Sequence, residues 1–377
     1  MVRSPLSPFS SPFSTRPKAA SSLVIQTSYL GDVILTTPLL AALARRGPVD
    51  VVTTPAAAAI LANHPAVHSV IPYDKRGDAA GLPGMWRLAR ALRKRYRARQ
   101  QDSIAADDRD AAMPVAYLAQ GSMRSATLAL LVGCEERVGF ETSSGRALYT
   151  RRVTYDPQRH HAERLWQLGA GDGTADPPAE ARQPRLYPGA DDVEAVDRLL
   201  AQAGYVDEPL IAVAPGSAWA TKRWPYYPAL TSALLPEWRI VVVGGPSDES
   251  RAAEIITAAG RIRTRVINAT GRLTPLATAA LLSRCWALVT NDSMPQHLAS
   301  AMGTPTLSIF GPTVPAFGFG PLAPRQAIAG RADLACRPCD RHGPQRCPLS
   351  HWRCMREIGV ADVARMVADL ASAPHLS

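Results

Sequence analysis

The sequence lacks any uninterrupted apolar run long enough to cross a membrane, which takes about 20 residues. Residues 51–73 and 293–324 carry no Asp, Glu, Lys or Arg, but repeated Pro together with Asn and His, or with Gly, interrupts both. The first 20 residues hold four Pro, five Ser and three cations, without the apolar core of a signal peptide. We therefore expect a cytoplasmic protein in which residues 1–21 form a disordered arm or precede the true start codon.

Cysteine and lysine are both scarce. Six Cys in 377 residues are too few for a secreted domain that is stabilised by disulfides. The chain has only four Lys among 42 cations, so Arg is its default cation and each Lys is informative. The net charge of +10 favours partners rich in phosphate, such as nucleic acid, anionic lipid or a phosphorylated sugar.

Short β-rich runs alternate with helical stretches from Ser22 onward, which predicts an α/β fold with parallel sheets. Length and a Gly- and Pro-rich linker at 171–190 divide the chain into two Rossmann-like domains, 22–185 and 186–358. A last helix within 359–377 is expected to cross back to the first domain. Predicted strands lie at 23–27, 49–53, 67–71, 113–118 and 136–140, then at 210–214, 239–243, 286–290 and 305–310. Ligands of such sheets bind beyond the carboxyl ends of the strands, so the cleft between the domains is the expected site.

The first candidate motif follows the first predicted strand and contains Ser28, Gly31 and Asp32. Gly31 permits close backbone approach, and Asp32 lies at the mouth of the cleft, where a carboxylate can take a proton from a hydroxyl. Asp32 could equally complement the dipole of a helix N-terminus. No GxGxxG follows this strand, so a dinucleotide cofactor is disfavoured and no cofactor is expected.

The second motif, residues 215–225, combines a Gly turn, the hydroxyls of Ser217 and Thr221, and the cation of Lys222. These are the groups that a diphosphate requires, and Lys222 is one of the scarce lysines. The alternative is an exposed loop with an ordinary basic pair.

Two further loops follow predicted strands in the second half. In the first, Asp292 or Ser293 can cap a helix whose N–H groups favour an anion, with His297 one turn inside. In the second, Asp248 and Glu249 could accept hydrogen bonds from ribose hydroxyls, or could simply begin a helix.

Taken in order, these segments resemble glycosyltransferase family 9, the heptosyltransferases of lipopolysaccharide inner-core assembly. The matching segments cover about residues 22–370: GDVILTTPLLAAL, MRSATLALLVGCEERVGF, ALYTRRV, PGSAWATKRWP, VVVGGPSDE and NDSMPQHLASAMGTPTLSIFGPT. The tail, CRPC…CPLSHWRC, resembles heptosyltransferase II-type members. The resemblance implies a GT-B fold, an ADP-heptose donor, a lipid A acceptor that bears Kdo or heptose, inversion at the anomeric carbon and no essential metal.

The resemblance also implies roles for individual residues. Asp32 corresponds to the general base, with Ser28, Gly31 and Arg124 on the acceptor side. Donor binding falls to the residues of the three later loops: Ser217, Thr221, Lys222, Asp248, Glu249, Asp292, Ser293 and His297. The family usually has Gly where this chain has Met294, which keeps open a different nucleotide-sugar or acceptor. A non-catalytic binder of lipid-linked sugar or nucleic acid is the remaining alternative, although a phosphate loop together with an acid favours an enzyme and no nucleic-acid module is present.

Two features lie outside these motifs. Four Cys fall within 19 residues: Cys336, Cys339, Cys347 and Cys354. Their spacing lacks a second tight pair, so reduced thiols are favoured over a structural zinc site. Residues 87–99 carry seven cations and no acid, which predicts peripheral contact with the anionic inner-membrane surface.

Overall fold

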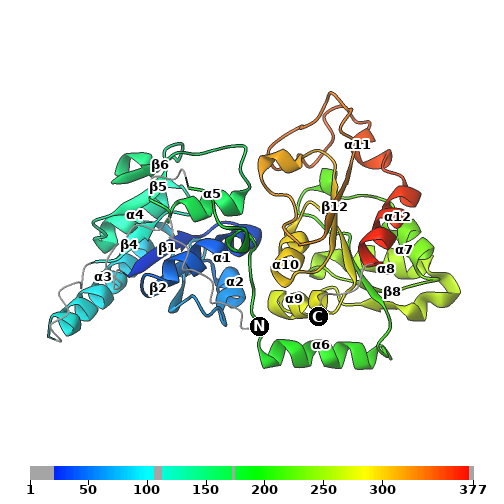
Figure 1. Cartoon of the computed structure of the whole chain (residues 1–377), viewed down its shortest axis with the longest axis horizontal. Helices are drawn as coiled ribbons and strands as arrows, with labels where there is room; N and C mark the ends of the chain where they lie inside the picture. Colours follow the sequence, from blue (N-terminus) through cyan, green and yellow to red (C-terminus); the bar gives the residue numbers. More distant parts are fainter. Residues whose placement is uncertain (1–20, 106–112, 172–174, 373–377) are drawn as a thin grey trace, which may run out of the picture.

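The computed structural model describes residues 21–105, 113–171 and 175–372. It contains two six-stranded sheets, and all their strand pairs are parallel. Figure 1 shows two lobes side by side, each a sheet flanked by helices. The predicted α/β class is therefore confirmed.

The first sheet has the strand order β3-β2-β1-β4-β5-β6. Its strands are β1 (Ser22–Gln26), β2 (Val49–Thr53), β3 (Ser69–Pro72), β4 (Val115–Tyr117), β5 (Arg137–Phe140) and β6 (Arg151–Val153). The helices of this half are α1 (Leu30–Ala44), α2 (Pro55–Ala58), α3 (Gly81–Ala105), α4 (Met123–Val132) and α5 (His161–Gln167). Pro38 lies inside α1, so the helix begins before it and Asp32 falls in the first turn.

The second sheet has the order β12-β11-β10-β7-β8-β9. Its strands are β7 (Leu210–Ala214), β8 (Arg239–Val242), β9 (Val266–Asn268), β10 (Ala287–Asn291), β11 (Thr306–Phe310) and β12 (Gln326–Gly330). The helices are α6 (Ala190–Gln202), α7 (Tyr227–Leu234), α8 (Glu249–Ala258), α9 (Pro275–Ser283), α10 (Met294–Met302), α11 (Arg353–Arg356) and α12 (Val360–Ala371).

All nine predicted strands are present, and the three that the sequence analysis missed, β6, β9 and β12, lie at sheet edges. The central strands are buried on both faces and read as apolar runs, whereas β6 and β9 have only three residues and β12 exposes alternate residues.

The last helix does not follow its prediction. Val363, Val367 and Leu370 of α12 join the apolar core of the second sheet, beside α7. The expected crossing to the first domain is therefore wrong for the described residues, because the apolar face of α12 is buried against α7 and the strands β10, β11 and β12 of the second half. The domain limits at 185 and 358 stay predictions.

The two halves also touch through helices. α1 packs against α10, and Ile34 of α1 is fully buried among apolar residues of the second half. This contact brings the start of α1, with Asp32, toward the loops at the carboxyl ends of β7, β8 and β10.

Candidate active site

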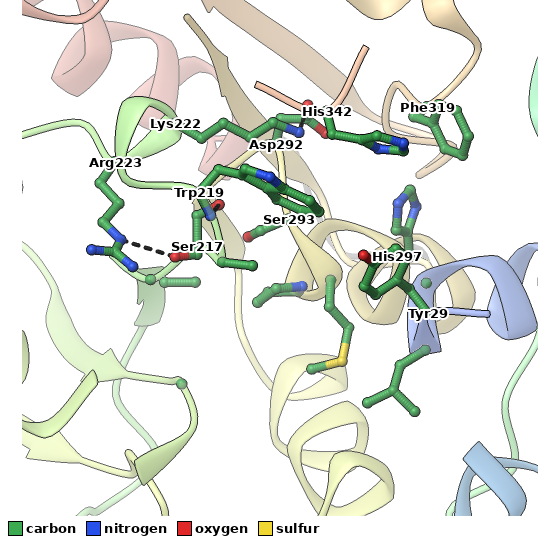
Figure 2. Close-up of a pocket in the computed structure, with 18 of the residues that line it drawn as sticks. Tyr29, Ser217, Trp219, Lys222, Arg223, Asp292, Ser293, His297, Phe319 and His342 are labelled. Carbon is green, nitrogen blue, oxygen red and sulfur yellow. Dashed lines mark hydrogen bonds and ion pairs between the residues drawn. The ribbon is translucent and has the colours of Figure 1, made fainter. Parts of the chain in front are cut away.

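A cavity of about 620 Å³ opens between the carboxyl ends of the two sheets (Figure 2). The first half contributes the start of α1, where the Tyr29 ring meets the Trp219 ring edge to face at 5.9 Å. The second half contributes the loops after β7, β8 and β10. The predicted site residues that line the cavity are Gly31, Asp32, Ser217, Lys222, Asp248, Asp292, Ser293 and His297.

Four predicted residues do not line it. Ser28 lies just behind Asp32 and hydrogen bonds to it. Thr221 is buried and donates to the backbone carbonyl of Pro344, so its hydroxyl is engaged elsewhere. Glu249 is exposed at the start of α8, which leaves Asp248 as the acid that faces the cavity. Arg124 is exposed at the start of α4; burial lowers the pKa of Lys75, and the charge of Arg124 lowers it further.

Asp32 is the only carboxylate that the described part of the first half places in the cavity. Burial raises its pKa above the ordinary value of 3.8, opposed by hydrogen bonds from the Ser28 hydroxyl and the Tyr29 backbone and by the charges of His342 and Arg341. The Ser28 Oγ donates to Asp32 Oδ2 at 2.5 Å. A carboxylate with a raised pKa is a stronger base than an exposed one.

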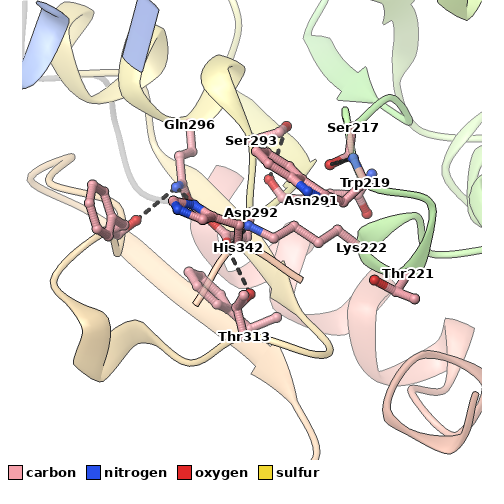
Figure 3. Close-up of polar contacts among 12 residues, drawn as sticks. Ser217, Trp219, Thr221, Lys222, Asn291, Asp292, Ser293, Gln296, Thr313 and His342 are labelled. Carbon is pink, nitrogen blue, oxygen red and sulfur yellow. Dashed lines mark hydrogen bonds and ion pairs between the residues drawn. The ribbon is translucent and has the colours of Figure 1, made fainter. Parts of the chain in front are cut away.

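Lys222 and Asp292 form a buried ion pair across the loops after β7 and β10 (Figure 3). The Lys222 Nζ lies 2.6 Å from Asp292 Oδ2, and their side chains are 8% and 10% exposed. Thr313 Oγ1 donates to the same oxygen at 2.7 Å, and Gln296 Nε2 donates to Oδ1 at 3.3 Å. The ammonium also lies 5.3 Å from the centre of the Trp219 ring. The predicted phosphate cation is thus already paired with a carboxylate inside the cavity.

The N-terminus of α10 is open toward the cavity. Ser293 occupies the N-cap position, but neither it nor Asp292 makes the expected side-chain cap within the described structure. The Ser293 hydroxyl instead donates to the Asn291 carbonyl at 3.3 Å. The positive end of the helix dipole therefore faces the cavity without a capping side chain, which favours an anion there.

His297 lies one turn inside α10, against Gly31 of the other half. A Cβ at Gly31 would come within 2.8 Å of the His297 ring, so the close approach of α1 and α10 requires glycine. Burial, with the nearby charges of His160 and Lys222, lowers the pKa of His297 to about 3 despite the opposing charge of Asp292. The imidazole is neutral at physiological pH.

Arg341 and His342 also line the cavity, and the sequence analysis did not find them. They come from the loop between Cys339 and Cys347. The His342 ring stacks on Trp219 with centroids 5.5 Å apart, and Gln345 holds the loop through its contact with Ala220 N at 3.1 Å. No strand precedes this segment, so the strand-end pattern could not reveal it; a basic pair between cysteines was the only local signal.

The four clustered Cys line a separate cavity of about 240 Å³ together with His351. All of them are free thiols. In the part of the chain that the structure describes, no group of three or more His, Cys, Asp or Glu side chains is arranged to hold a metal ion. Metal binding by this cluster is therefore not proposed.

Two Rossmann-like halves that face each other across such a site define the GT-B fold. Two solved structures share the fold. An ADP-heptose lipopolysaccharide heptosyltransferase II from E. coli has a TM-score of 0.72 and 22% identity, over 93% of this chain and 98% of its own. A family 9 glycosyl transferase from Veillonella parvula has a TM-score of 0.77 and 21% identity, over 95% and 98%.

Residues 109–349 match the profile of glycosyltransferase family 9 (heptosyltransferase). The lipopolysaccharide heptosyltransferase 1 of Pseudomonas aeruginosa is 31% identical over 84% of this chain and 85% of its own. The lipopolysaccharide heptosyltransferase 2 of Salmonella typhimurium is 28% identical over 78% and 84%. The chain therefore belongs to glycosyltransferase family 9 and is a glycosyltransferase.

Proposed function

We propose that this enzyme transfers heptose from ADP-heptose to the lipopolysaccharide inner core, with inversion at the anomeric carbon and without a metal ion. One observation carries the proposal: a single cavity holds a partly buried carboxylate from the first half and a lysine, an arginine and an open helix N-terminus from the second. Membership in family 9 and the relatives named above support heptose as the sugar.

Asp32 is the proposed general base. It takes the proton of the acceptor hydroxyl, whose oxygen then bonds to the anomeric carbon as the bond from that carbon to the diphosphate oxygen breaks. Because Asp32 and the anion-binding groups lie on opposite halves of the cavity, attack comes from the face opposite ADP, and the anomeric configuration inverts. The raised pKa of Asp32 supports this role.

Lys222, Arg223 and the N-terminus of α10 are the proposed sites of charge stabilisation on the departing ADP. Lys222 is shared between Asp292 and the diphosphate, so donor binding loosens the ion pair. Protein cations supply the neutralisation that a metal supplies in other transferases, which is the reason for proposing metal independence. Asp248 is the proposed partner of the ribose.

Met294 lines the cavity beside these groups, where its side chain could favour a nucleotide-sugar other than ADP-heptose. Its side chain packs against the apolar residues under α10, where the family usually has no side chain. A transferase with another nucleotide-sugar or acceptor is therefore the alternative function.

The acceptor side carries cations suited to an anionic core sugar. The Lys75 Nζ donates to the Thr27 carbonyl at 2.7 Å, and the charge of Arg124 acts on Lys75. These cations are the proposed contacts for the carboxylate of a Kdo-bearing acceptor on lipid A.

Helix α3 is the proposed contact with the inner-membrane surface, at which a cytoplasmic enzyme would meet its acceptor. Figure 1 shows α3 on the outer side of the first lobe. Arg95 and Arg99 of α3 contact Asp50, at 3.7 Å and 2.9 Å, which leaves five exposed cations: Arg87, Arg90, Arg93, Lys94 and Arg97. Leu82 and Trp86, which are 75% and 52% exposed, lie on the same helix. Nowhere in the described ranges does a helix have the length and apolar character of a membrane span.

The test is a donor and acceptor screen with the purified enzyme. ADP-heptose and a Kdo-bearing acceptor should give stoichiometric ADP and one glycosidic product, whose anomeric configuration is read by NMR, with and without EDTA. Retention of configuration, or loss of turnover in EDTA, would contradict the proposed mechanism. Faster turnover with a different nucleotide-sugar would favour the alternative function.

A further inference from the structure

The first turn of α5 is clamped to the loop 317–320 of the second half. The backbone N–H of His161 donates to the Gly318 carbonyl at 2.7 Å, and Arg164 Nη2 donates to the Phe317 carbonyl at 2.7 Å. His160 Nε2 lies 3.0 Å from the Gly320 carbonyl. Gly318 has φ +89°, and a Cβ there would come within 2.7 Å of the Arg159 carbonyl, so only glycine fits this contact. The start of α5, which packs on α1 in the first half, is therefore held from the second half as well.

The clamp aims the His161 ring at Asp32. His161 Nε2 lies 3.8 Å from Asp32 Oδ1, and the Phe319 ring covers the imidazole with centroids 4.8 Å apart. Ser28 holds the other carboxylate oxygen, Oδ2. Asp32 thus has a polar neighbour at each oxygen: Ser28 donates to Oδ2, and His161 Nε2 faces Oδ1 at 3.8 Å, a distance that must shorten for its N–H to donate.

The protonation of His161 decides what it can do. Burial and the charge of Arg164, followed by those of His160, Arg341 and His297, hold the pKa of His161 well below its usual 6.5. The ring therefore carries one proton, and its Nδ1 is buried without a hydrogen-bond partner among the described residues. The tautomer with the proton on Nε2 is favoured, because only that nitrogen faces an acceptor. A buried ring near the guanidinium groups of Arg164 and Arg341 cannot take a second proton readily, which excludes it as a base or proton relay.

We propose that His161 is a positioning residue whose Nε2–H steers the Asp32 carboxylate toward the acceptor hydroxyl when the two halves close. The inference rests on the proposed role of Asp32 as the base. It adds that the second half, through Phe319 and Gly318, controls the orientation of a base that belongs to the first half.

The test compares His161→Phe with His161→Gln. Phenylalanine keeps the packing against Phe319 but removes the N–H, whereas the Gln amide nitrogen can occupy the place of Nε2. We expect kcat to fall about tenfold in His161→Phe, the scale of a small misplacement of a reacting group, with KM for the donor nearly unchanged. The pKa of the acidic limb of the pH–kcat/KM profile should rise by about one, because the carboxylate loses a donor while Ser28, Tyr29, Arg341 and His342 remain. His161→Gln should restore both values toward those of the parent.

His160→Phe is the matched control. It loses the contacts with Gly320 and with the Ala162 N–H, but the bonds from His161 N to Gly318 and from Arg164 to Phe317 remain and no group that faces Asp32 is removed. It should therefore lower thermal stability without moving the acidic limb. An unshifted acidic limb and parental kcat in a folded His161→Phe enzyme would overturn the inference, as would equal losses in the Phe and Gln variants. Asp32→Asn separates the two proposals: if that variant keeps parental turnover, the proposed base fails, whereas a dead Asp32→Asn beside an unaffected His161→Phe refutes only the role of His161.

Discussion

The buried pair of Lys222 and Asp292 makes a quantitative prediction about stability. Lys222→Met keeps most of the side-chain stem but leaves Asp292 buried without its cation. Removing one partner of a buried ion pair costs about 3–5 kcal/mol. Asp292 keeps hydrogen bonds from Thr313 at 2.7 Å and Gln296 at 3.3 Å, so we expect the lower end, about 3 kcal/mol of the free energy of unfolding.

Urea denaturation of both single variants and the double variant measures the coupling. Asp292→Asn leaves Lys222 without a counter-charge beside Trp219 and should also destabilise the enzyme. The double variant, Lys222→Met with Asp292→Asn, should cost less than the sum of the two by about 2 kcal/mol, since the second change removes a charge that the first left unpaired.

Calorimetric titration with ADP tests the same pair from the ligand side. Lys222→Met should weaken ADP binding by about 1.5–3 kcal/mol, the worth of hydrogen bonds to charged groups. Asp292→Asn should bind ADP at least as well as the parent, because the diphosphate no longer competes for Lys222. A Lys222→Met enzyme within about 0.5 kcal/mol of the parent in stability, the range of an ordinary surface change, would refute the argument from burial.

Further predictions address the base, the metal and the membrane. Asp32→Asn should lower turnover about 10²–10⁴-fold with unchanged ADP affinity by calorimetry; weakened ADP binding would return Asp32 to a donor-side role. Because burial raises the pKa of Asp32, turnover should fall with decreasing pH through a midpoint above 3.8, as pH–rate profiles can measure. Dialysis against EDTA should leave initial rates unchanged. Changing Arg93 and Arg97 to Gln should weaken sedimentation with anionic liposomes, whereas the same change at the exposed Arg261 and Arg263 of the second half should not; equal binding by both would remove the membrane contact.

Much of the fold was predictable because central parallel strands have a strong local signature. β7 and β8 are buried on both faces, and their sequences are continuous apolar runs bounded by polar loops. The edge strands were missed because β6 holds two Arg in three residues and β12 is half exposed, so burial left no pattern to detect.

Some residues of the candidate site could be predicted from the sequence, and others could not. Asp32, Lys222 and Asp292 could be found from the sequence because each lies in the segment that follows a strand, and the carboxyl ends of parallel strands meet at one edge of a sheet. Whether Asp248 or Glu249 faces the cavity could not be found, since adjacent residues at a helix start differ only in the direction of their side chains.

The sequence alone determined the class of fold, the order of the loops and the chemical groups that each loop offers, because these depend on local burial and residue type. Only the tertiary structure determined which side chains contact one another. Lys222 and Asp292 are separated by 70 residues, and Arg341 reaches the cavity from a segment that follows no strand. His161 faces Asp32 where α5 packs on α1, and Gly318 and Phe319 of the other half contact the same residue. Such contacts depend on how the two halves pack together, and no periodicity within the chain records that packing.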